Sequence, residues 1–443
     1  MNTKKKDLFK PIVSEKKLGS GFIQLTSNFN IDEPTRNMMN QVFSSFPDSD
    51  GNFVEQFQTT GFDARTFELY LYAYFKNSGY EIERDFDRPD FIIQQNGLRV
   101  AIEATTINPT AGKINIDKQE MLTKKELEYK QDHELPIKFG SPLFSKLNKR
   151  YWELEHCKEI PFVLAIEAFH EKGSLRYSSS SLIQYLYGEK DKGHINEEGS
   201  LVVEKEKIYE HKVGKKTIPS GFFYQPNVEN ISAIIFSNSG TTAKFKRMGY
   251  QEGLYTTHMN VIRRGFAYDY TPNALTPEYF VHNLAERSNE SWGEGLVVCL
   301  NPNAKYPISQ DFFVDAAQYY VVDGNTVADI IGFHPYSSET LTISAEYERG
   351  QLPQEIRTLY KSELDNLISY LPVPPNVTEV EWYISNDENI IGLILLDETD
   401  KTWNYVCLKK GETQYRAVDI EIDFDELSKV RNNLFEKMLS YIL

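Results

Sequence analysis

The sequence predicts an α/β protein with a mixed-sheet core flanked by helices, an additional β-rich region and a C-terminal α+β module. Three observations predict this architecture: the length of 443 residues, alternating helix and strand patterns from about residue 51, and a proline-rich link at 371–375. A chain of this length exceeds what one hydrophobic core usually organises. We therefore expect an N-terminal extension over 1–50, a core over 51–190, a β-rich middle region packed on it over 191–345 and a separate module over 346–443.

Composition and charge exclude several classes of protein. Hydrophobic residues make up 40% of the chain, but no window approaches the roughly 18 uninterrupted apolar residues that cross a bilayer. No apolar signal segment follows the N-terminal lysines, so we expect a cytoplasmic protein without a membrane partner. Cys157, Cys299 and Cys407 lie too far apart for a zinc knuckle or a disulfide framework. The net charge of -16 means that any nucleic acid must meet a local basic patch.

The predicted core opens with a helix, a strand and a hairpin. Asp63 can cap the helix, Phe62 and Phe67 have the spacing of a hydrophobic staple, and Gly79 ends it. Residues 80–83 alternate as a strand does. Residues 91–103 carry Asn-Gly between two alternating apolar segments, which is the strongest short-range hairpin signal known.

The remaining elements follow in order along the chain. Residues 117–132 are highly charged with helical periodicity and predict a solvated insertion. Ser141 and Pro142 have the pattern of a helix start, and apolar residues continue along one stripe to Leu154. Further strands are expected at 161–166, 231–236, 295–300, 380–385, 390–396, 405–408 and 415–422, with a last helix from Asp423.

The hairpin brings two acidic residues together. If residues 96–97 form a two-residue turn, the register places Asp90 directly opposite Glu103, with Cβ atoms roughly 4.5 to 5.5 Å apart. Like charges this close either share a proton or bind a cation. Oxygen ligands without nearby Cys or His favour Mg²⁺ or Mn²⁺, and such an ion can polarise a phosphodiester and activate water. The pattern therefore predicts a metal site suited to hydrolysis.

Other residues near this pair could complete it or neutralise it. Thr105 is expected on the same strand face as Glu103, and Glu68 on the preceding helix is a candidate third ligand. Arg88 could instead neutralise the two carboxylates without any metal. Four other acidic residues compete with Glu68 for the third position: Glu81, Glu83, Asp85 and Asp87.

These residues resemble the PD-(D/E)XK nuclease superfamily, which has the restriction-endonuclease-like fold. The match comprises Glu68 on the first helix, Asp90 after Pro89, and the segment Ile-Glu-Ala-Thr at 102–105. A helix over 142–156 and a strand over 161–169 complete it, so the resemblance covers about a quarter of the chain through a short motif. The resemblance implies that Glu68, Asp90 and Glu103 bind Mg²⁺ or Mn²⁺ in an endonuclease acting on DNA, in a restriction or defence role.

The chain departs from the family pattern at one position. Thr105 stands where the family has the lysine that orients or activates the attacking water. Some members carry the basic residue on the following helix, so the resemblance transfers this role to Lys146 or Lys149. The other units would then supply substrate selection, control or oligomerisation, with the C-terminal module as the surface for a homodimer or a partner protein.

Two other interpretations remain open from the sequence. The first is a catalytically inactive protein that keeps this fold to bind nucleic acid or a protein partner. The second is an interaction protein whose hairpin carboxylates pair with Arg88.

Residues 234–242 run from an apolar strand into Ser, Gly and Thr, but lack the Gly-Lys-Ser/Thr of a phosphate loop and predict a turn.

Overall fold

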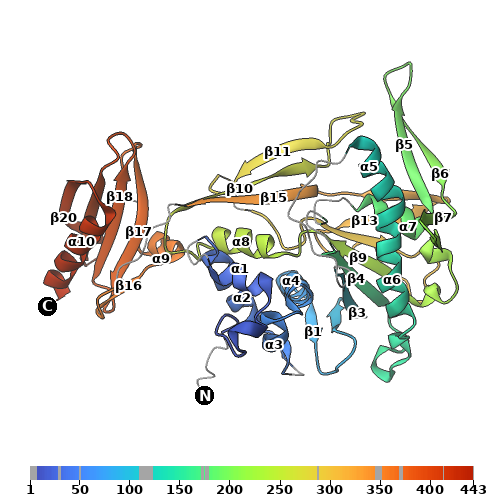
Figure 1. The fold of residues 1–443 in the computed structure, drawn as a ribbon, viewed down its shortest axis with the longest axis horizontal. Coiled ribbons are helices and arrows are strands. Elements are labelled where there is room, and N and C mark those ends of the chain that lie inside the picture. The colour runs from blue at the N-terminus through green and yellow to red at the C-terminus, as the bar shows by residue number, and fades with distance from the viewer. Residues whose placement is uncertain are drawn as a thin grey trace.

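The computed structural model describes residues 7–27, 31–48, 51–108, 123–170, 174, 179–286, 289–344, 352–368, 373–412 and 414–442. Within these residues the chain is a mixed α/β protein with one large mixed sheet flanked by helices and a smaller C-terminal sheet (Figure 1). The α/β class expected from the sequence is therefore confirmed. No helix of the described residues is both long and apolar enough to cross a bilayer.

The large sheet joins strands from the predicted core and from the middle region. Its described strands follow the spatial order β1-β2-β3-β4-β9-β12-β13-β14. The strands β3, β4 and β9 run parallel to one another, and the hairpin β2–β3 is antiparallel. Their bounds are β1 (Glu81–Glu83), β2 (Phe91–Gln95), β3 (Leu98–Ile107), β4 (Phe162–Ala168), β9 (Ala233–Ser237), β12 (Leu296–Leu300), β13 (Ala317–Val322) and β14 (Asn325–Asp329).

Helices cover both faces of this sheet because its central strands are apolar on both sides. On β3, Val100 and Ile102 face one hydrophobic cluster, and Ala101 faces the other. The first cluster contains α4 (Phe62–Asn77) and its neighbours, and the second contains α6 (Leu135–Leu147) and α7 (Ser180–Tyr187). The strands that carry the candidate site thus lie between two packed layers (Figure 1).

The N-terminal extension packs as part of the α4 layer. Its helices are α1 (Ser20–Ser27) and α2 (Glu33–Phe43), followed by α3 (Phe53–Gln58). Phe22 and Met39 are buried in the same cluster as Phe67 of α4. α2 also lies against α8 (Thr242–Gln251), the helix that follows β9. The extension therefore contacts both α4 of the predicted core and α8 of the middle region.

The segment before β4 forms a longer helix than the sequence indicated. α5 (Lys124–Tyr129), a π-helical turn (Lys130–Glu134) and α6 follow one another without a break, and residues 109–122 lie outside the described residues. The predicted start at Ser141-Pro142 is wrong, because Pro142 lies inside α6 while Pro136 occupies its first turn. The predicted end near His156 is also wrong, because Arg150 adopts a positive φ and only short 3₁₀ turns follow.

Smaller β elements surround the large sheet. Three strands of the middle region form a separate sheet in the order β11-β10-β15. The hairpin β5–β6 projects beside α7 (Figure 1), and the hairpin β7–β8 packs against α6 and the π-helical turn before it. Their bounds are β5 (Glu189–Ile195), β6 (Leu201–Lys207), β7 (Glu210–Val213), β8 (Lys216–Pro219), β10 (Met259–Ala267), β11 (Glu278–Asn283) and β15 (Pro335–Ser344).

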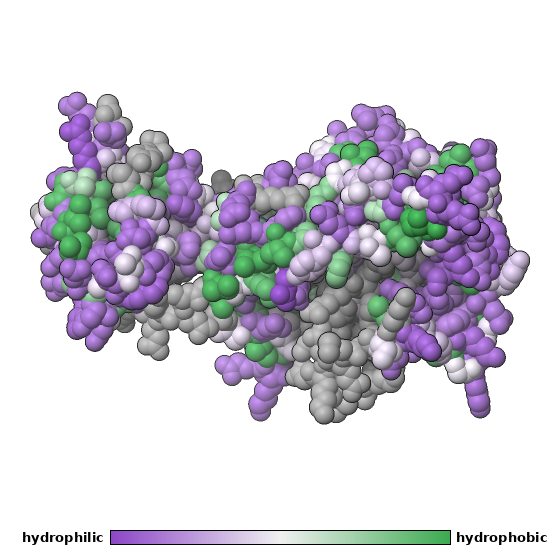
Figure 2. Space-filling model, turned by 90° about the horizontal axis from the view of Figure 1, so that it is seen from above, coloured by the Kyte–Doolittle hydropathy of each residue, from purple (hydrophilic) through white to green (hydrophobic). Residues whose placement is uncertain are grey.

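The C-terminal module is a five-stranded antiparallel sheet with a helix on one face. Its described strands follow the order β16-β17-β18-β19-β20, and α10 packs on β18 and β19. Figure 2 shows this module as a lobe beside the larger body. The bounds are β16 (Ile356–Thr358), α9 (Lys361–Leu367), β17 (Val377–Ser385), β18 (Ile390–Asp397), β19 (Trp403–Lys410), β20 (Tyr415–Phe424) and α10 (Leu427–Ile442).

A buried ion pair joins α10 to the sheet of this module. The Arg431 guanidinium donates to both carboxylate oxygens of Glu381 on β17, with Nε to Oε2 at 2.7 Å. Tyr383 also donates its hydroxyl hydrogen to Glu381. Both charged side chains are almost fully buried, so each depends on the other for the compensation of its charge.

We expect Arg431→Met to destabilise the module by about 3–5 kcal/mol, because the substitution leaves the Glu381 carboxylate buried without its cation. Hydrogen exchange of the β17 and β18 amides measures this change in the full chain. The matched control is Arg416→Met, which removes an exposed guanidinium from β20. Equal exchange in the two variants would contradict a stabilising role for the buried pair.

Candidate active site

The β2–β3 hairpin has the register that the sequence predicts. Phe91 pairs with Ile102 and Gln95 pairs with Leu98, across a turn in which Asn96 and Gly97 both have positive φ. Positive φ at both central positions is the requirement of a type I′ turn, and it explains the Asn-Gly sequence. The hairpin prediction is therefore confirmed in both its turn and its pairing.

Asp90 lies at the start of β2 and is held next to Glu103. Its Oδ2 accepts a hydrogen bond of 2.7 Å from the backbone N–H of Ala104, the residue after Glu103 on β3. This bond continues the hairpin contacts one step past the last paired residues. The turn and this bond together fix the two carboxylates on neighbouring strands.

Glu103 is buried, with 5% of its surface exposed, and its two oxygens have different surroundings. Lys146 on α6 donates from its ammonium to Oε1. Oε2 is shielded from solvent and has no hydrogen-bond partner among the described residues. A buried carboxylate oxygen without a partner is energetically costly, so this atom is available for a ligand.

The shared site raises the pKa of Asp90 to about 8. Burial is the largest cause, followed by repulsion from the carboxylates of Glu103 and Glu68. The Ala104 N–H and the Lys146 ammonium lower the pKa in part, without offsetting these effects. Asp90 therefore keeps its proton near neutral pH unless another positive charge arrives.

Glu68 lies near the pair but is already engaged. It is 4% exposed on α4 and forms ion pairs with Arg65 and with Arg84, whose Nη2 lies 2.6 Å from Oε1. The Arg84 guanidinium is itself packed over the rings of Phe46 and Phe91, at 4.2 and 4.7 Å from their centroids. Glu68 thus contributes charge to the site, while its oxygens bind guanidinium groups.

The four acidic residues that compete with Glu68 as the third ligand lie elsewhere. Of these, Glu83 forms an ion pair with Arg99, while Glu81, Asp85 and Asp87 are exposed. In the described parts of the chain, no group of three or more His, Cys, Asp or Glu side chains is placed to hold a metal ion. The structure gathers Asp90 and Glu103 but does not add a third free carboxylate.

The end of α6 lies between the two basic candidates, Lys146 and Lys149. Lys146 contacts Glu103 from the last turn of the helix, whereas Lys149 lies beyond it and is exposed. Thr105 is on β3 opposite Ile166 of β4, two residues from Glu103 and therefore on the same strand face. The structure thus brings Lys146, and not Lys149, to the carboxylates.

Arg88 is not the cation that compensates the pair. Its guanidinium lies 5.7 Å from the centroid of the Tyr151 ring, and its side chain is exposed. No ion pair joins it to Asp90 or Glu103 in the residues that the structure describes. Lys146 provides the nearby positive charge instead.

Sequence reasoning missed the contact that fixes the loop before Asp90. The rings of Phe86 and His156 stack in parallel, with centroids 3.8 Å apart. His156 Nε2 also lies 2.7 Å from the backbone carbonyl oxygen of Arg88. These residues are far apart in the chain and belong to no periodic pattern, so no sequence signal connects them.

The residues present fit a hydrated magnesium or manganese ion. Mg²⁺ is usually held by one or two carboxylates and keeps several waters, so a third protein ligand is not required. The unpartnered Oε2 of Glu103 and the raised pKa of Asp90 both indicate a deficit of positive charge. No family model, curated protein or solved structure matches this chain.

We expect Asp90→Asn to gain stability relative to the wild type as the pH rises from about 4 to about 8. Asp90 has an ordinary pKa of 3.8 and a folded pKa of about 8, so the folded state binds more protons in this interval. The free energy of unfolding of the wild type then falls with rising pH. Asparagine does not titrate, so the variant lacks this loss, and it keeps an oxygen for the Ala104 N–H.

Urea denaturation in EDTA at several pH values measures this difference. Asp87→Asn serves as the control, because Asp87 is an exposed carboxylate in the same loop. Parallel pH profiles for the wild type and Asp90→Asn would show that Asp90 is not held protonated.

Proposed function

We propose that this chain is a metal-dependent endonuclease of the PD-(D/E)XK type, acting on DNA in the cytoplasm in a restriction or defence role. The observation that carries the proposal is the convergence of Asp90, Glu103 and Lys146. Two acids and one lysine come from a hairpin and the helix that packs on it. The order of helix, strand, hairpin, helix and strand over 62–168 agrees with the restriction-endonuclease-like resemblance.

Asp90 and Glu103 would hold one Mg²⁺ or Mn²⁺ ion through their carboxylate oxygens. When bound, such an ion supplies positive charge for a phosphodiester and lowers the pKa of a coordinated water. Asp90 must lose its proton to act as a ligand, so binding should become tighter as the pH rises toward 8. Glu103 Oε2 supplies an oxygen that no protein group occupies in the described residues.

Lys146 would supply the ammonium group that Thr105 lacks. Its Nζ contacts Glu103 Oε1, and 24% of the side chain remains exposed, so a substrate phosphate or an attacking water can approach it. A preorganised positive charge stabilises negative charge that develops on the phosphate in the transition state. α6 packs on β3, and its last turn brings the Lys146 ammonium to Glu103.

Exposed basic residues near the site could contact the DNA backbone. Arg88 precedes Asp90 by two residues, and Lys149 follows Lys146 by three. Neither forms an ion pair in the described part of the chain, unlike Arg150, which pairs with Glu153. A local patch of this kind can bind phosphates even though the whole chain carries a net charge of -16.

One observation favours a catalytically inactive protein that binds nucleic acid or a partner. Glu68 is fully engaged by Arg65 and Arg84, so the carboxylate that the family places on its first helix is not free to bind an ion. In this second candidate the site binds metal or DNA without cleaving it. Metal-dependent DNA binding with no product would distinguish it from the nuclease.

The test is incubation with supercoiled DNA, linear DNA and RNA in the presence of Mg²⁺, Mn²⁺ or EDTA. We expect metal-dependent cleavage of DNA by the wild type. Asp90→Asn, Glu103→Gln and Lys146→Met should each reduce the rate by about 10²-fold or more, as removal of a single preorganised charge does in other enzymes.

Lys125→Met is the matched control for Lys146→Met, because it removes an exposed lysine charge from α5, the helical segment before α6. It should keep most of the activity and weaken DNA binding only slightly. Absence of a product under every condition, or full activity in Asp90→Asn, would contradict the nuclease assignment.

A further inference from the structure

A cavity lies far from the carboxylate pair. It has a volume of about 620 Å³ and opens between the hairpin β5–β6, the strands β13 and β14, and the loop that follows β10. In the sheet order β13 is four strands from β3, which corresponds to roughly 19 Å at the usual strand spacing. A cavity of this size suits a small organic molecule and is separate from the candidate active site.

Ion pairs and hydrogen bonds hold the cavity wall in place. Glu189 on β5 accepts a hydrogen bond of 3.0 Å from the Thr326 N–H on β14. Lys205 on β6 donates to the Thr326 carbonyl at 2.8 Å and pairs with Asp191 at 2.5 Å. Lys207 pairs with Glu189 at 2.8 Å. The hairpin is thus fixed to the sheet edge, and the charges of Glu189 and Asp191 are compensated by Lys207 and Lys205.

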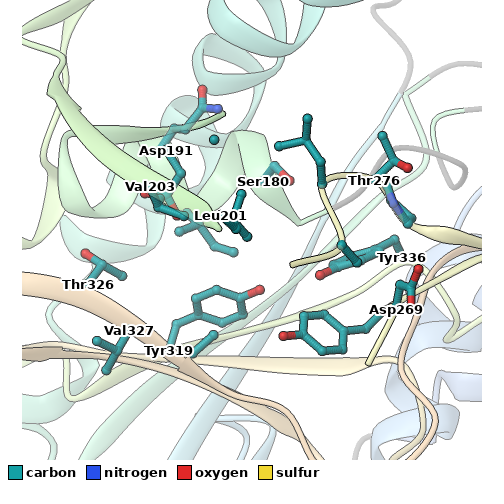
Figure 3. Close-up of a pocket in the computed structure, with 18 of the residues that line it drawn as sticks. Ser180, Asp191, Leu201, Val203, Asp269, Thr276, Tyr319, Thr326, Val327 and Tyr336 are labelled. Atoms are coloured by element: carbon teal, nitrogen blue, oxygen red, sulfur yellow. The ribbon is translucent and has the colours of Figure 1, made fainter. Parts of the chain in front are cut away.

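Three tyrosines from different elements line the cavity: Tyr268 after β10, Tyr319 on β13 and Tyr336 on β15. Figure 3 shows Tyr319 and Tyr336 on one side of the pocket, with Asp191, Leu201 and Val203 across from them. None of the three hydroxyls makes a hydrogen bond to the described residues. Tyr268 and Tyr336 have ring centroids 6.4 Å apart and planes tilted by 59°, so they are not parallel plates for a stacked base.

One lining carboxylate has no compensating cation. Asp269 follows Tyr268, accepts a hydrogen bond from the Thr271 N–H, and forms no ion pair with the described residues. Hydrogen bonds from the Thr271 hydroxyl and from its N–H lower the pKa of Asp269, which is ionised at neutral pH. Since Lys205 and Lys207 compensate Asp191 and Glu189, Asp269 leaves the cavity with excess negative charge, which disfavours phosphates and other anions.

Apolar side chains complete the lining beside these polar groups. Leu201 and Val203 come from β6, Leu275 and Pro277 from the loop after β10, and Val327 from β14. Aromatic rings, an unpaired carboxylate and aliphatic walls together favour a cation that carries its own apolar surface. A methylated ammonium group has these properties, because rings attract its charge and aliphatic walls contact its methyl groups.

We propose that this cavity binds a small molecule with a methylated ammonium group, which Asp269 and the tyrosines Tyr268, Tyr319 and Tyr336 of its lining would contact. The site requires no metal and no activity of the carboxylate pair. It gives the chain a second ligand, bound at the opposite end of the sheet from the candidate active site.

Isothermal titration calorimetry of the full chain with choline tests the proposal. The matched probe is 3,3-dimethyl-1-butanol, which has the shape of choline but carries carbon in place of the charged nitrogen. We expect choline to bind at least about tenfold more tightly than this neutral isostere. A short peptide containing trimethyllysine is the third probe, and its affinity relative to choline assigns the ammonium group to a free molecule or to a protein tail.

Two variants locate the binding. Asp269→Asn removes the charge of the carboxylate and Tyr336→Leu removes one ring, so they should weaken choline binding by about tenfold and severalfold respectively. Asp329→Asn is the control, because Asp329 is an exposed carboxylate on β14 that does not line the cavity. Thermal unfolding of each variant in the absence of a ligand verifies that the fold is kept.

Failure of both ammonium probes to bind would overturn the proposal. Equal affinity for choline and its neutral isostere would also overturn it, as would unchanged binding in Asp269→Asn. These outcomes are independent of the nuclease assay, because the titrations contain EDTA and no nucleic acid.

Discussion

The repulsion between Asp90 and Glu103 is the constraint on which the candidate site depends. A tight turn and an antiparallel ladder force the two carboxylates onto neighbouring strands, and screening by water is limited because Glu103 is buried and Asp90 is half-buried. One ammonium, from Lys146, compensates only part of this charge. The arrangement therefore costs folding free energy unless protonation or a cation relieves it, and such costs are commonly retained at functional sites.

The rest of the architecture keeps this site in place. The β2–β3 hairpin packs between the helix layer that contains α4 and the helix layer that contains α6. Neither strand can shift without disturbing one of the two hydrophobic clusters. On one side α6 delivers Lys146, and on the other Arg65 and Arg84 bind Glu68. From β3 the sheet extends through β4, β9 and β12 to β13, which lines the cavity described above. The candidate site and this cavity thus lie on one sheet, while the ligands proposed for them differ in chemistry.

Local interactions were predictable from the sequence, and distant ones were not. The Asn96-Gly97 turn determines the hairpin register because turn type and two-residue periodicity act within a few residues. The pairing of Glu68 with Arg84 depends on where β1 ends and on the packing of Arg84 over Phe46, which no local pattern encodes. The membership of β9 and β12 in the same sheet likewise follows from long-range pairing. Pro142 indicated a helix start by its usual preference, but Pro136 held that position.

Anomalous diffraction from crystals grown with Mn²⁺ at pH 8, close to the pKa of Asp90, tests most directly whether the two carboxylates bind an ion. We expect a manganese peak within coordination distance of both Asp90 and Glu103, with Lys146 still beside Glu103. An empty site flanked by well-ordered carboxylates, or a peak bound by other residues, would contradict it.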